Sequence, residues 1–144
     1  MFHHILISLI FLALCTACKP NGTAPSTTNV LPISPGMAHN LILQQQDNSN
    51  FHIIDVRTPD EFKAGHIEHA KHIDWNNASQ RTQLLNLNKD HTYLVYCKTG
   101  RRSKAAVDFL KANGITRVFN LSGGLQHWNN VVGSYIPSPQ NELK

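Results

Sequence analysis

One cysteine, Cys97, lies between an apolar run over residues 93–96 and a loop of the kind that activates thiols. The loop holds one glycine and three cations: Lys98, Gly100, Arg101 and Arg102. An alanine-rich helical pattern follows over residues 104–111. Free N–H groups and the positive end of the dipole at a helix start favour a thiolate over a thiol. The pattern therefore predicts a reactive cysteine; the alternative is a buried structural cysteine at a strand end.

The same loop would hold an anion against the sulfur, because N–H groups at a helix start bind anions and the cations add to the attraction. In the whole chain of 144 residues, 13 Lys and Arg face 9 Asp and Glu, a net charge of +4. This excess is small and scattered, which argues against nucleic acid as a partner. A small anionic substrate fits the pattern better.

The first residues are typical of a targeting segment. An apolar block over residues 5–14 is followed by small residues and then Cys18. This layout indicates a secretory signal peptide over residues 1–17 and export to a periplasm. The segment also resembles a bacterial lipoprotein signal, which would make Cys18 the site of a lipid anchor. Two features depart from that pattern: residues 1–4 lack Lys and Arg, and Cys15 occupies a place where an aliphatic residue is usual.

The rest of the chain divides into three parts. Residues 18–32 are rich in Asn, Thr, Pro and Ser, which predicts a flexible linker. Residues 33–133 are long enough for one domain with a real core. Residues 134–144 contain two prolines and are expected to form a loose tail. If Cys18 is lipidated, Cys97 is the only free thiol of the mature protein.

Strand and helix signals alternate through the domain. Apolar runs predict strands over residues 51–56, 69–73, 93–96 and 117–121. Helices are expected in the intervals: from Ser34-Pro35 to a polar run at 44–50, after Thr58, over 77–87, from the cysteine loop to Asn113-Gly114, and after Ser122-Gly123-Gly124. In the first of these helices, Met37, Leu41 and Ile42 should face the core.

This alternation predicts an α/β fold in which helices cover both faces of a central parallel sheet. In such sheets, ligands bind at the carboxyl ends of the strands. Asp55 and Cys97 both stand at the carboxyl ends of predicted strands. We therefore expect the functional site to lie there.

Three separated segments resemble the rhodanese family. Its N-terminal signature is similar to residues 54–70, IDVRTPDEFKAGHIEHA; its active-site loop to residues 97–103, CKTGRRS; and its C-terminal signature to residues 123–128, GGLQHW. Each segment is weak by itself, but three in order at sensible spacing are a strong match. The resemblance covers about residues 33–132, and single-domain rhodaneses exported to the bacterial periplasm are most similar.

The resemblance implies a rhodanese-like fold and a thiosulfate sulfurtransferase that needs no cofactor. Cys97 would take the sulfane sulfur of thiosulfate or a similar small anionic donor, become a persulfide and release sulfite. Cyanide or a thiol, including that of a redox protein, would then accept the sulfur. The active-site loop would bind the substrate through Lys98, Thr99, Gly100, Arg101, Arg102 and Ser103.

Other polar residues have milder roles. Asp55 and Arg57 are expected to shape the site or buttress the fold, with Arg57 paired to Glu61 one helical turn on. His66 should hydrogen-bond to the backbone. The nine histidines are scattered and have no metal-ligand spacing, so no metal site is expected.

Two alternatives stay open. Cysteine phosphatases and arsenate reductases share the rhodanese fold, but they need an arginine six places after the cysteine. That place holds Ser103, and Arg102 falls one short, so the loop favours sulfur chemistry. The second alternative is a non-enzymatic sulfur carrier or binding module, since many rhodanese domains are inactive and lack the cysteine. The presence of Cys97 weakens this alternative.

Overall fold

The structure is a computed structural model that describes residues 32–133. The predicted signal peptide, Cys18, nearly all of the predicted linker and the tail at 134–144 lie outside the described residues. No helix within residues 32–133 has the length and apolar character needed to cross a membrane.

A five-stranded parallel sheet forms the centre of the domain, in the order β1-β5-β4-β2-β3. Its strands are β1 (Pro32–Ile33), β2 (Phe51–Asp55), β3 (Lys71–His72), β4 (Thr92–Tyr96) and β5 (Val118–Leu121). The neighbours β2 and β4 pair over their full lengths, with Asp55 opposite Tyr96. Asp55 and Cys97 therefore emerge side by side at the carboxyl edge, as the sequence predicted.

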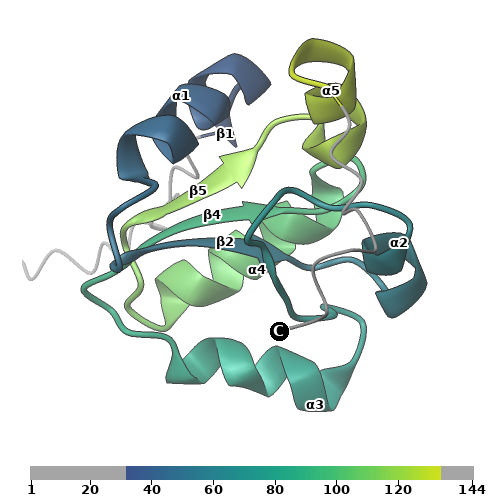
Figure 1. The fold of residues 1–144 in the computed structure, drawn as a ribbon. Helices are drawn as coiled ribbons and strands as arrows, with labels where there is room; N and C mark the ends of the chain where they lie inside the picture. The colour runs from purple at the N-terminus through teal and green to yellow at the C-terminus, as the bar shows by residue number, and fades with distance from the viewer. Residues whose placement is uncertain (1–31, 134–144) are drawn as a thin grey trace, which may run out of the picture.

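Helices cover both faces of this sheet. On one face lie α1 (Pro35–Gln45) and α5 (Gly124–Val131); on the other lie α3 (Ala78–Arg81), the 3₁₀ helix η1 (Thr82–Asn86) and α4 (Arg101–Ala112). The short helix α2 (Pro59–Lys63) lies beyond the carboxyl ends of the strands, on the right in Figure 1. This arrangement confirms the predicted α/β architecture.

Successive side chains of each strand point to opposite faces, which produces two cores. Ile54 and Val95 pack with Val107 of α4 in one core. Ile53 and Leu94, one residue earlier on each strand, belong to the other core, which α5 completes. Its Trp128 is buried there. The sheet is therefore covered on both faces where the strands deliver Asp55 and Cys97.

Three local predictions were wrong or incomplete. Met37 is 64% exposed, because the buried stripe of α1 runs through Pro35 and Ala38, while Leu41 and Ile42 are only partly buried. The helix expected over residues 77–87 is one α-helical turn followed by the 3₁₀ helix η1. The edge strand β1 was not predicted; its two residues are too few for a period-2 pattern.

Candidate active site

The thiol of Cys97 lies directly after β4, where α4 begins. Its Sγ accepts a hydrogen bond from the N–H of Gly100 at 3.2 Å. The hydroxyl of Ser103, on the first turn of α4, lies 3.5 Å from Sγ and 3.2 Å from the Gly100 carbonyl, so its one proton can serve either acceptor. Cys97 is only 1% exposed. The sulfur is thus enclosed by donors from its own loop.

Gly100 is the residue that allows this loop to close. It is the N-cap of α4 and has a φ of +92°, a conformation that side chains rarely adopt. A Cβ at this position would also lie 3.3 Å from the backbone nitrogen of Gly123 and 3.4 Å from the carbonyl of Leu121. No side chain caps the helix. The first N–H groups of α4 are therefore available to the sulfur.

The loop shifts the thiol towards its charged form. Burial acts to raise the pKa of Cys97, but hydrogen bonds from the Ser103 hydroxyl and from the N–H groups of Ser103, Thr99 and Gly100 outweigh it. The net effect is a pKa below the ordinary value of a cysteine. A lowered pKa makes the sulfur a thiolate, the nucleophilic form, over a wider pH range.

The start of α5 stabilises the same loop through backbone hydrogen bonds. The N–H of Leu125 donates to the Cys97 carbonyl at 2.8 Å, and the N–H of Gln126 donates to the Lys98 carbonyl at 3.1 Å. Gly124 lies so close to these peptides that a Cβ there would collide with them. Residues 123–128 thus bind the carbonyls of the cysteine loop, while the start of α4 provides hydrogen-bond donors to the Cys97 sulfur.

Asp55 and Arg57 form a buried ion pair next to the loop. Two nitrogens of the Arg57 guanidinium donate to the Asp55 carboxylate at 2.7–3.0 Å, and Nη2 also donates to the Gly65 carbonyl at 2.6 Å. Burial acts to lower the pKa of Arg57, but the bonds to Asp55 raise it overall. The predicted pair between Arg57 and Glu61 is wrong, because the guanidinium turns back to Asp55.

Glu61 instead binds Arg102 of the cysteine loop. The guanidinium donates twice to the carboxylate, at 2.7 and 2.8 Å, and these bonds lower the pKa of Glu61 to about 2. Glu61 also accepts the N–H of Thr58, which completes a capping box at the predicted start of α2. Arg102 therefore approaches the site with its charge already compensated. No local sequence pattern indicates this partner, which lies 41 residues away along the chain.

The other predicted loop residues lie at the rim. Lys98, Thr99 and Arg101 are exposed. Thr99 contributes its N–H to the stabilisation of the thiolate, whereas the side chains of Lys98 and Arg101 form no ion pair within residues 32–133. Asn120, which the sequence did not single out, lies beneath the loop and donates to the Gly100 carbonyl at 3.4 Å. The only feature of the sequence that could have indicated this role of Asn120 is a polar side chain within a mainly apolar predicted strand.

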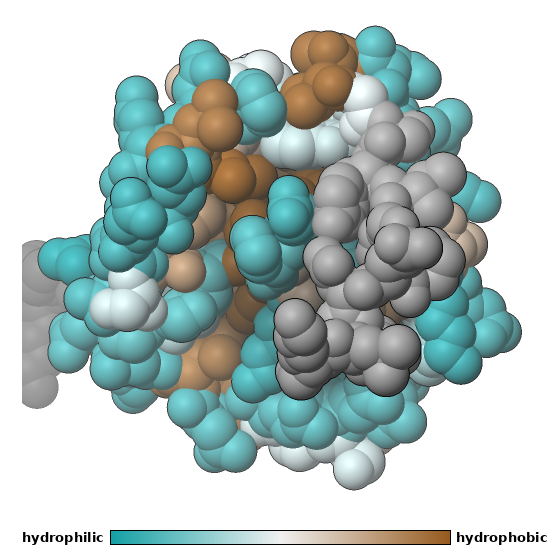
Figure 2. Space-filling model, in the orientation of Figure 1, coloured by the Kyte–Doolittle hydropathy of each residue, from teal (hydrophilic) through white to brown (hydrophobic). Residues whose placement is uncertain are grey.

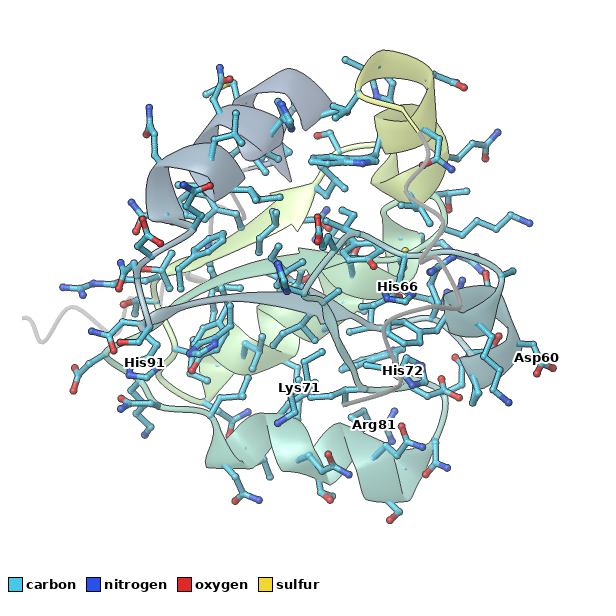
Figure 3. All side chains as sticks on the ribbon, viewed as in Figure 1. Asp60, His66, Lys71, His72, Arg81 and His91 are labelled. Atoms are coloured by element: carbon cyan, nitrogen blue, oxygen red, sulfur yellow. The ribbon has the colours of Figure 1, made fainter. Side chains whose placement is uncertain are left out.

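Three of the described histidines lie outside this cluster. His66 and His72 lie beside α2, whereas His91 lies at the opposite end of the sheet (Figure 3). The ring of His66 is 3.0 Å from the Phe62 carbonyl, the backbone contact that the sequence predicted, and stacks on the Phe62 ring. Within residues 32–133, no group of three or more His, Cys, Asp or Glu is placed to hold a metal ion.

Comparison with known proteins gives the site a context. The rhodanese-like domain family matches residues 38–131. A thiosulfate sulfurtransferase, GlpE, of Stutzerimonas stutzeri is 29% identical over 115 residues, 80% of this chain and 99% of that protein. The uncharacterized protein YqhL of Bacillus subtilis is 41% identical over 76 residues. The match covers 53% of this chain and 59% of YqhL.

Solved structures agree on the fold. A rhodanese-like domain protein from Staphylococcus aureus is 32% identical, with a TM-score of 0.61 over 75% of this chain and 99% of that one. A protein of unknown function from Rhodopseudomonas palustris, described as a possible tyrosine phosphatase, has a TM-score of 0.60 at 21% identity over 75% of this chain and 85% of its own. The second likeness concerns the fold alone, so the chemistry must be argued from the loop.

Proposed function

Because the chain belongs to the rhodanese-like domain family, we propose that it is a sulfurtransferase in which Cys97 carries the transferred sulfur as a persulfide. One observation carries this proposal: the Cys97 sulfur is enclosed by N–H groups and a hydroxyl that lower its pKa. The relative GlpE, named a thiosulfate sulfurtransferase, supports thiosulfate as the donor.

The first half of the reaction follows from the loop. The Cys97 thiolate attacks the outer sulfur of thiosulfate, a new S–S bond forms, and sulfite leaves with the electron pair of the broken S–S bond. Backbone N–H groups of the loop, with Lys98 and Arg101 at the rim, would bind the dianion and stabilise the charge on sulfite. The resulting persulfide is also anionic near neutral pH, so the same N–H groups stabilise the intermediate.

We expect Arg102 to have mainly a structural role, although its position in the loop suggests substrate binding. Its guanidinium is engaged by Glu61, so its charge is shared between the carboxylate and the site. We expect it to orient the start of α4 and to contribute less to thiosulfate binding than the uncompensated Lys98 and Arg101. Asp55 and Arg57 hold the neighbouring loop in place and touch no reacting atom in this mechanism.

The activity is tested with thiosulfate and cyanide, by following thiocyanate. We expect the wild-type protein to produce it and the variants Cys97→Ser and Cys97→Ala to produce none. Hydrolysis of p-nitrophenyl phosphate without sulfur transfer would instead favour a phosphatase. The loop argues against that outcome, because Ser103 occupies the place where phosphatases need an arginine.

A non-enzymatic sulfur carrier is the second candidate. A relative from Bacillus subtilis, 33% identical over 81 residues and 43% of its own length, is named a putative sulfur carrier protein. A carrier would take up sulfur on Cys97 and pass it to one protein while reacting slowly with cyanide. Persulfide formation without turnover would identify that case.

The proposed place of action rests on the first 18 residues. We propose that the protein is exported to a periplasm, with Cys18 as the candidate for a lipid anchor. The intact mass of the protein isolated from its native cells tests both points. A mass that includes residues 1–17 would contradict export through a cleaved signal peptide.

A further inference from the structure

A cavity opens beside the cysteine loop, between α2 and α5. Its volume is about 300 Å³, at the lower end of the range for small-molecule sites. The cavity is lined by Arg57, Glu61, Ala64, Lys98, Leu125, Gln126 and Asn129. Lys98 is the residue that follows Cys97, so the cavity adjoins the loop that holds the reactive sulfur.

The walls of the cavity carry an excess of positive charge. Glu61 is compensated by Arg102, and Arg57 is compensated by Asp55. The ammonium group of Lys98 forms no ion pair within residues 32–133. One positive charge at the cavity is therefore left without a partner from the described part of the chain.

The cavity is also lined by side chains with hydrogen-bond donors that could bind a ligand. Arg57 is 5% exposed, and its Nε and Nη2 are used by Asp55 and Gly65, but Nη1 donates to no acceptor within residues 32–133. The side-chain amides of Gln126 and Asn129 are exposed on α5. Ala64 and Leu125 provide an apolar wall between these polar groups. This combination suits a small organic molecule with an anionic end.

We propose that the cavity binds the sulfur acceptor, and that the acceptor is a small thiol bearing a carboxylate. This inference rests on the proposed sulfurtransferase function. Lys98 and the free face of Arg57 would hold the carboxylate, and the amides of α5 would bind the remaining polar groups. Cyanide needs no cavity of this size, and the thiosulfate site is the cradle of N–H groups around Cys97.

The transfer step is a displacement at sulfur. The acceptor thiolate attacks the outer sulfur of the Cys97 persulfide, and a new S–S bond forms. The bond between that sulfur and Cys97 Sγ breaks, and its electron pair stays on Sγ as the thiolate. The product is the persulfide of the acceptor, and Cys97 returns to its starting state without an added oxidant or reductant.

The test compares two acceptors of similar size, the anionic 3-mercaptopropionate and the neutral 3-mercaptopropionamide, with each rate expressed per thiolate present. The full protein is loaded with thiosulfate and desalted, and the rate of sulfur loss from Cys97 is measured with each thiol. The quantity of interest is the ratio of the two rates. We expect the carboxylate thiol to react faster, and the advantage to shrink as salt is added.

Two adjacent asparagines of α5 provide matched variants. Asn129 lines the cavity and Asn130 does not, although both are exposed on the same helix. We expect Asn129→Asp to lower the ratio about threefold and Asn129→Lys to raise it about threefold, as for a single screened charge several ångströms away. The same changes at Asn130 should leave the ratio within error. Lys98→Ala should bring the ratio close to one.

The outcomes separate this inference from the proposed function. A ratio near one in the wild type, or equal effects at Asn129 and Asn130, would overturn the acceptor site while leaving sulfur transfer intact. A protein that gains no sulfur from thiosulfate would instead overturn the proposed function, and the acceptor site with it. A ratio that follows the charge at Asn129 alone would establish the acceptor site.

Discussion

Two potential anions stand at the ends of neighbouring strands, and the protein treats them differently. Asp55, the last residue of β2, and Cys97, directly after β4, are both buried, with 0% and 1% exposure. A guanidinium neutralises Asp55 and fills its hydrogen-bonding positions, which makes that end of the sheet a structural support. For Cys97, N–H dipoles and a hydroxyl favour the thiolate without cancelling its charge. The Arg102 guanidinium, which also interacts with Cys97, is itself bound by Glu61. These surroundings favour the nucleophilic form of the sulfur.

A groove with a partly apolar lining lies apart from these two positions. Polar residues dominate the rim of the face seen in Figure 2, whereas apolar side chains gather in a groove across its middle. Ile42 of α1 and Trp128 of α5 line one groove together with Ile67, and no residue of the cysteine loop lines it. The candidate chemistry thus lies at the polar, cation-bearing end of the sheet.

The largest difference between the two strand ends should appear in activity. Cys97→Ser is expected to lower thiosulfate:cyanide transfer by at least about a thousandfold, since the nucleophile itself is lost. The free energy of unfolding should change by less than about 1 kcal/mol, because serine fits the space of the thiol. Initial rates of thiocyanate formation and urea denaturation measure the two effects. Residual transfer near the wild-type rate would show that another group carries the sulfur.

The converse variant removes the other anion. Asp55→Asn leaves the buried Arg57 charge without its carboxylate and should lower the free energy of unfolding by about 3 kcal/mol. The exposed pair of Lys104 and Asp108 offers a matched control, since Asp108→Asn should cost less than about 0.5 kcal/mol. Urea denaturation at neutral pH compares the variants. Equal costs would mean that burial of the Asp55 pair has no structural consequence.

The third variant weakens the donors around the sulfur. Ser103→Ala removes the hydroxyl, which is one of the donors that lower the pKa of Cys97, so that pKa should rise. A thiolate is lost as pH falls through its pKa, so the half-point of alkylation against pH should move upward. In the wild type this half-point should lie below the value of about 8.5 for an ordinary cysteine. An unchanged half-point in the variant would assign the whole shift to the N–H groups.

The smallest expected effect concerns the ion pair between Glu61 of α2 and Arg102 of the cysteine loop. Glu61→Gln removes the ion pair with Arg102 and should lower the free energy of unfolding by about 1 kcal/mol at neutral pH. The folded-state pKa of Glu61 is about 2, below its ordinary 4.5, so the pair stabilises the fold above pH 4.5 and is lost towards pH 2. The wild type and the variant should converge in urea denaturation below that window. A constant difference across pH would contradict the ion-pair account.

Much of this arrangement was predictable from local patterns. The strand before Cys97, the helix start after Thr58 and the helix end at Asn113-Gly114 depend on neighbouring residues and were confirmed. The partner of Arg102 depends on how α2 packs at the strand ends, which no local pattern contains. The same holds for Asn120 beneath the loop and for the cavity between α2 and α5. Local chemistry therefore indicated Cys97 as the candidate nucleophile, and tertiary packing determined which nearby cations are left without a partner in the described part of the chain.

The mass of the protein after incubation with thiosulfate tests the central claim most directly. We predict a gain of one sulfur atom, located on the peptide that contains Cys97, and its loss when cyanide is added. The gain should be absent in Cys97→Ser. An unchanged mass in the wild type, with the thiol still open to alkylation, would contradict the account of Cys97 as a sulfur-carrying nucleophile.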